Sequence, residues 1–291
     1  MTAPRPAAPP AEPRPPVAVT RLDGSLATPG DLAALALYNY GHFTTLRVEQ
    51  GRVRGLGLHL RRLADDCRTL FGTDPDTATG LTDGVRAALR RVARAHEAPL
   101  TVRVTVCATD TTLEGPGTAA PTALLSTRPA ATAAPPPLRL TAATYVRDLP
   151  EVKHTGLFGT LRLRADVRRR GFDDALLLDH DGHVLEGTTW NICFWDGTRL
   201  LWPRGRALPG VTARLLRDAA AEAGVPVGDA PLTRAGLGSL RAAFATNAAF
   251  GVRPVARVDE VAFAQYAPDD DVTALTATLT DRYADVPGEP L

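Results

Sequence analysis

Lys153, in the stretch EVKHTGLF, is the residue of this chain with the most distinctive chemistry. It is the one lysine among 33 residues of Lys or Arg type, so every other one is an arginine. A lysine amine can lose its proton, attack a carbonyl and form a Schiff base, whereas a guanidinium stays charged. A compositional bias that replaces exposed lysines by arginines should spare lysine only where arginine cannot substitute. Lys153 is therefore a candidate covalent nucleophile, and the alternative is a surface lysine kept by chance.

Glu186 and Arg62 could complete a site around Lys153. Glu186, in LEGTTWN, follows a predicted hairpin, where a carboxylate could hold a protonated ring nitrogen. Arg62, in HLRRL, lies in the first turns of a predicted helix, where a guanidinium could bind a phosphate through two donors. Taken singly, each type of residue is more often a solvated surface charge, so the combination has to carry the argument.

Two segments of small residues could supply backbone groups for a phosphate. Val211 and Thr212 open a predicted helix, where free N–H groups and the helix dipole favour an anion. A loop between two predicted strands has side chains small enough for its amides to approach a ligand closely: Asn247, Ala248 and Ala249. Either segment could also be a simple connection. A Schiff-base lysine, a ring-nitrogen carboxylate and two phosphate-binding elements together describe a site for pyridoxal 5′-phosphate.

Six segments, in order along the chain, give a family resemblance. They are GHFTTLRVEQGRV, HLRRL, VKH, GFDDALLLDHDGHVLEGTTWN, LPGVT and TNAAFGVRPV. Together they resemble the fold type IV pyridoxal-phosphate enzymes, the class IV aminotransferases, which include branched-chain aminotransferase, D-amino acid aminotransferase and aminodeoxychorismate lyase. The resemblance runs from about Tyr40 to Val255 and so covers most of the chain.

The resemblance implies a role for each matching position. Lys153 would form the Schiff base and move the substrate's α-proton, Arg62 would bind the phosphate, and Glu186 would hydrogen-bond the pyridine nitrogen. The rest of the phosphate site would come from Val211, Thr212, Asn247 and Ala248. The resemblance further implies a two-lobed α+β fold with the cofactor between the lobes, in a homodimer whose partner helps to close the site.

Substrate contacts are less sharply defined by the sequence. Arg103, in LTVRVTV, could bind a substrate carboxylate, as a comparable strand arginine does in some transaminases, or it could form a structural salt bridge. His42 and Ala249 lie near the expected site and are weaker candidates, since such a histidine is more often a hydrogen-bonding scaffold residue. Phe158 stands where branched-chain aminotransferases have a tyrosine, and Ala213 stands where an arginine commonly follows GVT. Because of these departures, the sequence does not identify the substrate.

The expected function is an aminotransferase that moves an amino group between an amino acid and a 2-oxo acid. A lyase of the aminodeoxychorismate type would use the same cofactor and lysine, and it is the first alternative. The second alternative is a family member that has lost catalysis and serves as a binding protein. Retention of Lys153 argues against this, because in an inactive site the same compositional bias would have replaced this lysine by arginine.

Composition limits the partners and the compartment. With 33 basic and 32 acidic residues the charge is nearly balanced, so nothing favours nucleic acid as a partner. No apolar run approaches the roughly 18 residues needed to cross a bilayer, and the N-terminus lacks an apolar signal core. We therefore expect a cytoplasmic protein with small-molecule substrates. Three separated cysteines predict reduced thiols, and without a CxxC or HExxH motif we expect no metal site.

The order of predicted strands and helices favours an α+β fold, because it shows no regular βαβ repeat. Residues 1–17, with seven prolines, are expected to be a disordered tail, and residues 129–137 a linker. These segments leave a small N-terminal α+β domain at 18–128 and a larger C-terminal α+β domain at 138–291. The expected elements include helices at 59–72, 82–97, 157–170, 208–224 and 271–284, and hairpin turns at Gln50-Gly51 and Asp181-Gly182.

Overall fold

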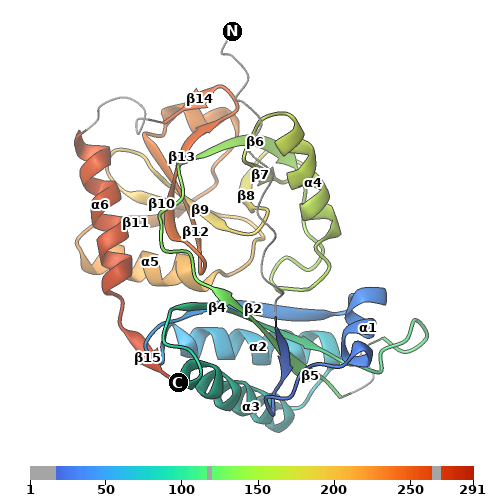
Figure 1. Ribbon diagram of the computed structural model, residues 1–291. Helices are drawn as coiled ribbons and strands as arrows, with labels where there is room; N and C mark the ends of the chain where they lie inside the picture. The colour runs from blue at the N-terminus through green and yellow to red at the C-terminus, as the bar shows by residue number, and fades with distance from the viewer. Residues whose placement is uncertain (1–17, 117–119, 264–269) are drawn as a thin grey trace.

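The chain forms two lobes, each built around a β-sheet, as Figure 1 shows. The computed structural model describes residues 18–116, 120–263 and 270–291. Over these residues helices and strands are mixed, which confirms the α+β prediction. The expected tail at 1–17 lies outside the described residues.

The first lobe contains an antiparallel sheet covered by helices on one face. Its strands, in spatial order, are β1 (Val19–Arg21), β5 (Thr122–Pro129), β4 (Leu100–Cys107) and β2 (Gly41–Val48). Leu46 and Val104 pack against Leu63 of α2 (Leu56–Phe71) and Val85 of α3 (Pro75–Arg94) in one buried cluster. Because side chains alternate along a strand, the neighbours of these core residues point to the opposite face, toward the second lobe.

The second lobe contains a larger mixed sheet. Its strands, in spatial order, are β11 (Val227–Ala230), β10 (Leu200–Pro203), β9 (Asn191–Trp195), β12 (Ala242–Asn247), β13 (Gly251–Val258), β6 (Leu138–Thr144), β7 (Asp174–Leu178) and β8 (Val184–Gly187), with β14 (Val261–Ala262) beside β13. The helices of this lobe are α4 (Phe158–Arg169), α5 (Val211–Glu222) and α6 (Asp270–Asp285), and a 3-10 turn covers Ala235–Ser239. β6 and β7 are parallel and joined through α4, so this part of the lobe is a βαβ unit.

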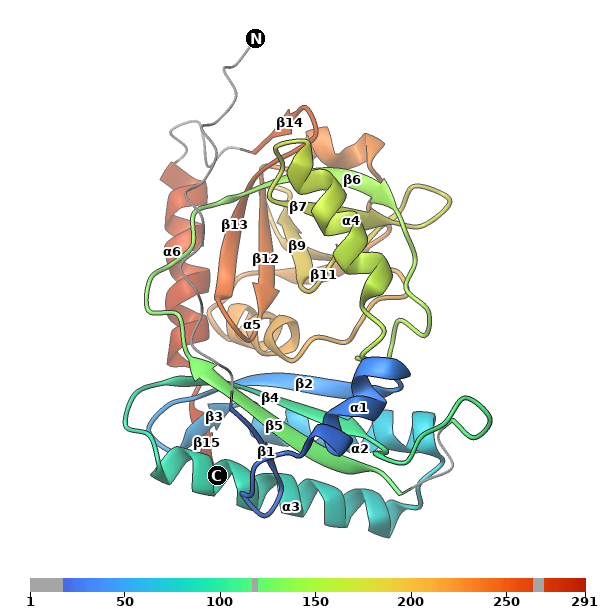
Figure 2. The same cartoon turned by 45° about the vertical axis from the view of Figure 1, so that its right-hand side comes forward.

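The chain passes between the lobes more than once, as Figure 2 shows. Residues 130–137 lead from β5 to β6. After α6 the chain returns to the first lobe, where β15 (Gly288–Pro290) pairs with β3 (Arg52–Arg54). The division of the chain into domains at 129–137 stays a prediction. The last residues of the chain contact the first lobe.

The helix expected at 82–97 begins earlier in the structure. α3 starts at Pro75 because the Asp74 side chain caps it, accepting the Thr77 N–H at 2.9 Å, and proline fits the first helical position. The other expected helices and both hairpin turns are present, with ends shifted by a few residues.

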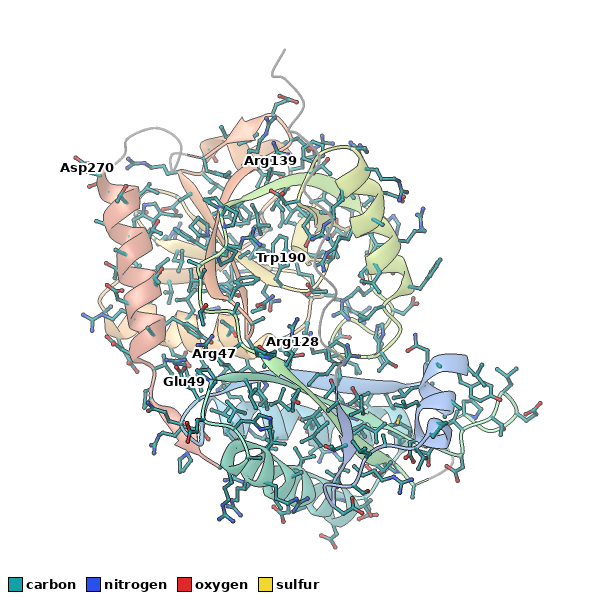
Figure 3. The ribbon with its side chains drawn as sticks, in the orientation of Figure 1. Arg47, Glu49, Arg128, Arg139, Trp190 and Asp270 are labelled. Carbon is teal, nitrogen blue, oxygen red and sulfur yellow. The ribbon has the colours of Figure 1, made fainter. Side chains whose placement is uncertain are left out.

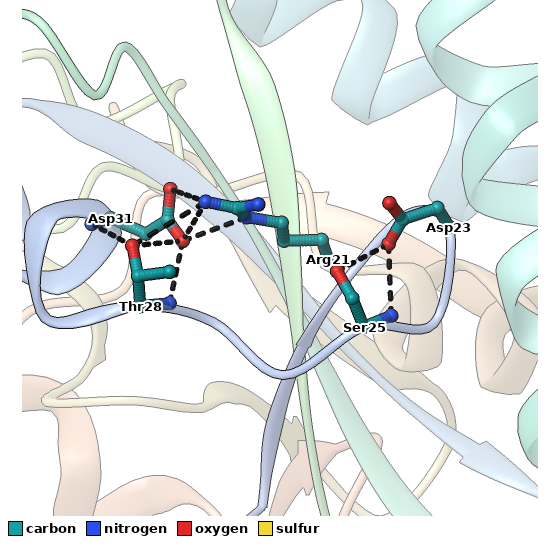
Figure 4. Close-up of polar contacts among 5 residues, drawn as sticks. All are labelled: Arg21, Asp23, Ser25, Thr28 and Asp31. Atoms are coloured by element: carbon teal, nitrogen blue, oxygen red, sulfur yellow. Dashed lines mark hydrogen bonds and ion pairs between the residues drawn. The ribbon is translucent and has the colours of Figure 1, made fainter.

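A short helix, α1 (Pro29–Leu37), was missed by the sequence analysis. Its start is held by the polar network in Figure 4. Thr28 accepts the Asp31 N–H at 3.3 Å, and Asp31 accepts the Thr28 N–H at 2.7 Å, which is a capping box. Arg21 of β1 donates to both carboxylate oxygens of Asp31, at 2.8 and 3.0 Å, and so ties the helix to the sheet.

Candidate active site

A cavity of about 230 Å³ is lined by residues of both lobes and collects nearly all the residues that the sequence analysis singled out. Its lining includes Arg62, Arg103, Lys153, Glu186, Val211, Thr212, Asn247, Ala248 and Ala249. These residues come from α2, β4, the segment after β6, β8, the start of α5 and the turn after β12. Residues that are far apart in the sequence therefore meet at one place.

Lys153 lies on a short extended segment that pairs with β2 of the first lobe. Phe43 N donates to the Lys153 carbonyl at 2.9 Å, and Thr155 N donates to the Gly41 carbonyl at 2.8 Å. The Lys153 N–H donates to Asp66 Oδ2 at 3.1 Å. These bonds fix the backbone, while the side chain lines the cavity with Nζ 4.8 Å from the centre of the Phe43 ring.

The surroundings of Lys153 lower the pKa of its amine from the ordinary 10.5 to about 7. Burial is the largest cause, because a charged amine loses its hydration inside the protein. The positive charges of Arg62 and Arg147 lower the pKa further, whereas the charge of Glu186 raises it. Much of the amine is therefore neutral near pH 7, which is the form that attacks a carbonyl carbon.

Glu186 forms a buried ion pair with Arg147. Arg147 Nε donates to Glu186 Oε1 at 2.9 Å, and the two side chains are 9% and 7% exposed. Burial raises the pKa of Glu186, and the charge and hydrogen bond of Arg147 oppose that rise. Arg147 also donates to the carbonyls of Pro150 and Val152, so it ties Glu186 to the segment just before Lys153.

Arg62 lies in a buried polar network on α2. It donates to Thr44 Oγ1, which is joined to His59 Nδ1 by a hydrogen bond of 2.7 Å. Burial lowers the pKa of Arg62 to about 10, while the nearby Asp66 carboxylate raises it. The Arg62 Nε atom is buried and has no hydrogen-bond partner within the described parts of the chain, so it is one donor available to a ligand in the cavity.

The start of α5 faces the cavity with free backbone N–H groups. Gly210 is the N-cap residue and offers no side chain to bond them. A Cβ atom at Gly210 would lie 1.8 Å from Asn191 Oδ1, so the close packing there requires glycine. Nearby, Asn247 Oδ1 accepts the N–H groups of Ala249 and Phe250 at 2.9 and 3.1 Å and holds the turn in shape.

His42 is the candidate that the structure does not bring to the cavity. Its ring is fully buried, with Nδ1 3.9 Å from Asp66 Oδ2 and its centre 6.2 Å from that of Phe71. Burial, and then the charge of Arg62, lower the pKa of His42 to about 3, so the ring is neutral. His42 is thus part of the packing behind Lys153.

Three polar residues of the cavity wall, Arg128, Arg147 and His59, were not singled out from the sequence. Arg147 precedes Lys153 by six residues, and this proximity was its one usable signal. Arg128 and His59 carry no signal that separates them from the other arginines and histidines.

The described residues fit pyridoxal phosphate. Two buried polar atoms of cavity residues, Arg62 Nε and Thr246 Oγ1, have no partner over the described ranges, and the first turn of α5 offers N–H groups beside them. A phosphate would satisfy such donors. Glu186 supplies a carboxylate and Lys153 an amine of lowered pKa, the two groups that the ring nitrogen and the aldehyde of this cofactor require.

Comparison with known proteins identifies the family. The family described as Amino-transferase class IV matches residues 41–258. The chain is also 28% identical over 263 residues to a putative branched-chain-amino-acid aminotransferase of Methanocaldococcus jannaschii, covering 86% of this chain and 88% of that protein.

Solved structures share the fold. The PLP-bound form of a hypothetical aminotransferase from Mycobacterium tuberculosis superposes with a TM-score of 0.72 at 22% identity, over 91% of this chain and 98% of that one. A putative 4-amino-4-deoxychorismate lyase from Legionella pneumophila superposes with a TM-score of 0.70 at 21% identity, over 86% and 93% of the two chains. At this level of identity the similarity concerns the fold alone.

Proposed function

This chain belongs to the class IV aminotransferase family, and we propose that Lys153 carries its chemistry. The protein is a pyridoxal-phosphate-dependent aminotransferase, and its substrates are amino acids and 2-oxo acids. The observation that carries the assignment of Lys153 is its buried amine, with a pKa of about 7, in one cavity with Glu186 and Arg62.

Lys153 has two tasks in this proposal. When bound, pyridoxal phosphate supplies an aldehyde and an electron-withdrawing ring that stabilises negative charge at the substrate's α-carbon. Lys153 Nζ would hold the cofactor covalently through its aldehyde carbon. As a free amine it would take the proton from the α-carbon of the substrate and pass it to the carbon of the former aldehyde, and a pKa of about 7 near the working pH suits both transfers.

Glu186 is proposed to face the ring nitrogen as a carboxylate. A negative charge there keeps that nitrogen protonated, which the electron-withdrawing role of the ring requires. Burial alone would favour the neutral acid, so the ion pair with Arg147 is needed to keep Glu186 charged. We assign Arg147 as a positioning residue, because it acts through Glu186 and through the carbonyls that precede Lys153.

The phosphate is proposed to lie between Arg62 and the start of α5. The N–H groups of Val211 and Thr212 and the helix dipole favour an anion there. The turn at Asn247 and Ala248 lines the same cavity and would complete this site. Arg62 supplies a full positive charge, and charge-assisted hydrogen bonds are roughly twice as strong as neutral ones.

Arg103 is proposed to meet a substrate carboxylate. It projects from β4 into the cavity, and its guanidinium carbon lies 3.6 Å from the centre of the Phe43 ring. Among the described residues its side chain makes one hydrogen bond, to Thr105 Oγ1 at 3.1 Å, so most of its donors can serve a ligand. Ala249, in the turn on the second lobe, would lie along the substrate, whereas His42 has no contact role.

We also propose that the protein is a homodimer that acts on small molecules. Large apolar side chains are exposed at Leu37, Leu113 and Phe158, at 74%, 78% and 77%, and a second copy of the chain would cover them in a homodimer. The near-neutral charge supports small molecules rather than nucleic acid as partners. Among the described residues no helix is both long and apolar enough to cross a bilayer, and we propose a cytoplasmic location.

The two half-reactions test the proposed function. Protein reconstituted with pyridoxal phosphate should lose its visible absorption band when an amino donor is added, and a 2-oxo acid should restore it. The archaeal relative is named for branched-chain amino acids, so leucine belongs in the donor screen beside glutamate. Pyruvate release from aminodeoxychorismate without an acceptor would instead support a lyase, and a colourless protein would support a binding role.

A further inference from the structure

A second, larger cavity of about 830 Å³ adjoins the first. Both cavities are lined by His59, Arg128, Ala248 and Ala249, so they meet at these residues. The second cavity extends from there along β2 and β5, under residues 129–135, to the end of α6. The second cavity therefore offers space directly beside the candidate active site.

The second cavity is strongly cationic. Arginine side chains from both lobes line it: Arg47, Arg54, Arg128 and Arg253. Glu49 is the one acidic residue of that lining within the described chain. Figure 3 shows Arg47, Glu49 and Arg128 at the boundary between the lobes. An excess of positive charge in a partly enclosed space attracts anions.

Three of these arginines already have protein partners. Arg47 donates to Glu49 at 3.3 Å and to the Ala131 carbonyl at 2.9 Å. Arg54 donates to the carbonyl of residue 284 at 2.9 Å, and Arg253 to that of residue 136 at 2.7 Å. In contrast, the Arg128 side chain makes no hydrogen bond or ion pair with any residue that the structure describes, and it lies where the two cavities meet.

The register of the first sheet places Arg128 beside Arg103. Arg103 lies opposite Ser126, and Thr101 lies opposite Arg128. Residues two apart on a strand point to the same face, so both guanidinium groups project from one face, from diagonally adjacent positions. Both side chains line the first cavity, so two anion-binding groups face it from the same sheet.

We propose that Arg128 binds a second, distal carboxylate of the substrate, so that this enzyme prefers amino acids and 2-oxo acids with acidic side chains over aliphatic ones. The proposal rests on the aminotransferase function above. In the proposed function Arg62 binds the phosphate, Arg103 binds the α-carboxylate and Arg147 pairs with Glu186. Of the arginines that line the first cavity among the described residues, Arg128 is thus the one left without a counter-charge. Since donor and acceptor occupy the same space in turn, both should carry the distal acid.

The sharpest test compares glutamate with glutamine as amino donors, because the two have the same shape and differ in the distal charge. A hydrogen-bonded charge contact of this kind corresponds to about 10- to 100-fold in kcat/KM. We expect glutamate to exceed glutamine and leucine by that factor. Arg128→Gln should remove the advantage by lowering kcat/KM for glutamate, while kcat/KM for glutamine changes less than about threefold.

A matched control carries the same charge change elsewhere. Arg90 is exposed on α3, which covers the face of the first sheet turned away from the cavity, so Arg90→Gln should leave both donors unchanged. Absorbance titration with pyridoxal phosphate should give the same affinity for wild type and both variants, which shows that Arg128→Gln is folded.

Equal use of glutamate and glutamine, or an equal loss for both donors in Arg128→Gln, would overturn the inference. An enzyme that uses leucine best would also overturn it and would leave the aminotransferase function intact. If no amino donor changed the visible band, the proposed function would fail together with this inference.

Discussion

The two walls of the cavity differ in how their charged groups are paired among the described residues. One, the cofactor wall, is formed by Arg62, Arg147, Lys153 and Glu186, where Arg147 and Glu186 form a buried ion pair and Arg62 donates to Thr44. The other, the substrate wall, is the sheet face that carries Arg103 and Arg128, where donors remain free among the described residues.

This difference separates the residues that carry out the reaction from those that select the substrate. Burial shifts the pKa values of the cofactor wall, and perturbed pKa values of this kind cluster at functional sites. Breaking a buried ion pair strands a charge and costs several kcal/mol, so this wall tolerates little change. The substrate wall keeps its charges partly hydrated, so substitutions there should alter which substrate is used rather than whether the reaction occurs.

Replacing the amine of the cofactor wall should have the largest effect. Lys153→Ala removes both the covalent attachment and the base, so we expect kcat to fall by about 10⁴-fold or more. Lys153→Arg keeps a positive charge that cannot act as a nucleophile, and it should lose as much. Steady-state assays at saturating cofactor measure this. Either variant retaining a tenth of the activity would show that the cofactor wall does not hold the catalytic amine.

Arg147→Gln should have the next largest effect. Without its partner the buried Glu186 carboxyl has a still higher pKa, so it becomes protonated and no longer supports the ring nitrogen. We expect kcat/KM to fall by about 10- to 100-fold, and the acidic limb of its pH profile to move to higher pH. The pH dependence of kcat/KM distinguishes this from a general loss of structure.

An exposed ion pair in the same region provides the control for Arg147→Gln. Arg206 Nε lies 2.9 Å from Glu151 Oε1, with side chains 71% and 51% exposed. Solvent screens such a pair, so Arg206→Gln should change kcat/KM by less than about twofold. Equal losses of kcat/KM in Arg147→Gln and Arg206→Gln would contradict this account, because they would show that the buried pair matters no more than the exposed one.

Arg62→Gln should weaken cofactor binding more than it slows the reaction. A hydrogen bond to a charged group is worth about 1.5 to 3 kcal/mol, so the Kd for pyridoxal phosphate should rise by about 10- to 150-fold. Once the cofactor is saturating, kcat should change little, because the proposed role of Arg62 is to bind the phosphate and not the reacting carbon. Absorbance titration gives the Kd, and an unchanged value would place the phosphate elsewhere.

Changing the pH should have the smallest effect. Only the neutral amine of Lys153 captures the cofactor, and its pKa is about 7. The rate of capture by the cofactor-free protein should therefore be about tenfold lower at pH 6 than at pH 8 and constant at higher pH. A lysine of ordinary pKa would show rates still rising toward pH 10.

In the cofactor-free protein the unfolded chain binds a proton that the native amine lacks. The free energy of unfolding should therefore rise with pH between about 7 and 10.5.

The sequence was most informative where the chemistry of a residue type cannot be replaced. Lys153 stood out because it is the one lysine among many arginines, and Val211 because the start of a helix offers free N–H groups whatever its side chains. The strands and helices that carry these residues follow from apolar periodicity, which the structure reproduces.

The sequence was least informative where function depends on tertiary proximity. Arg147 and Arg128 belong to an abundant residue type. Only the folded structure shows that Arg147 is in a buried ion pair and that Arg128 lines a cavity. His42 was placed near the site by its position on β2, but strand alternation turns its ring into the packing behind Lys153. The early start of α3 depends on a cap at Asp74 within a stretch of poor helix formers.

The most direct test of the central claim is to map where the cofactor is attached. Protein loaded with pyridoxal phosphate is reduced with borohydride, digested and analysed by mass spectrometry. The account predicts one reduced cofactor per chain, carried by the peptide that contains Lys153. Attachment at another position, or a reduced protein that carries no cofactor, would contradict it.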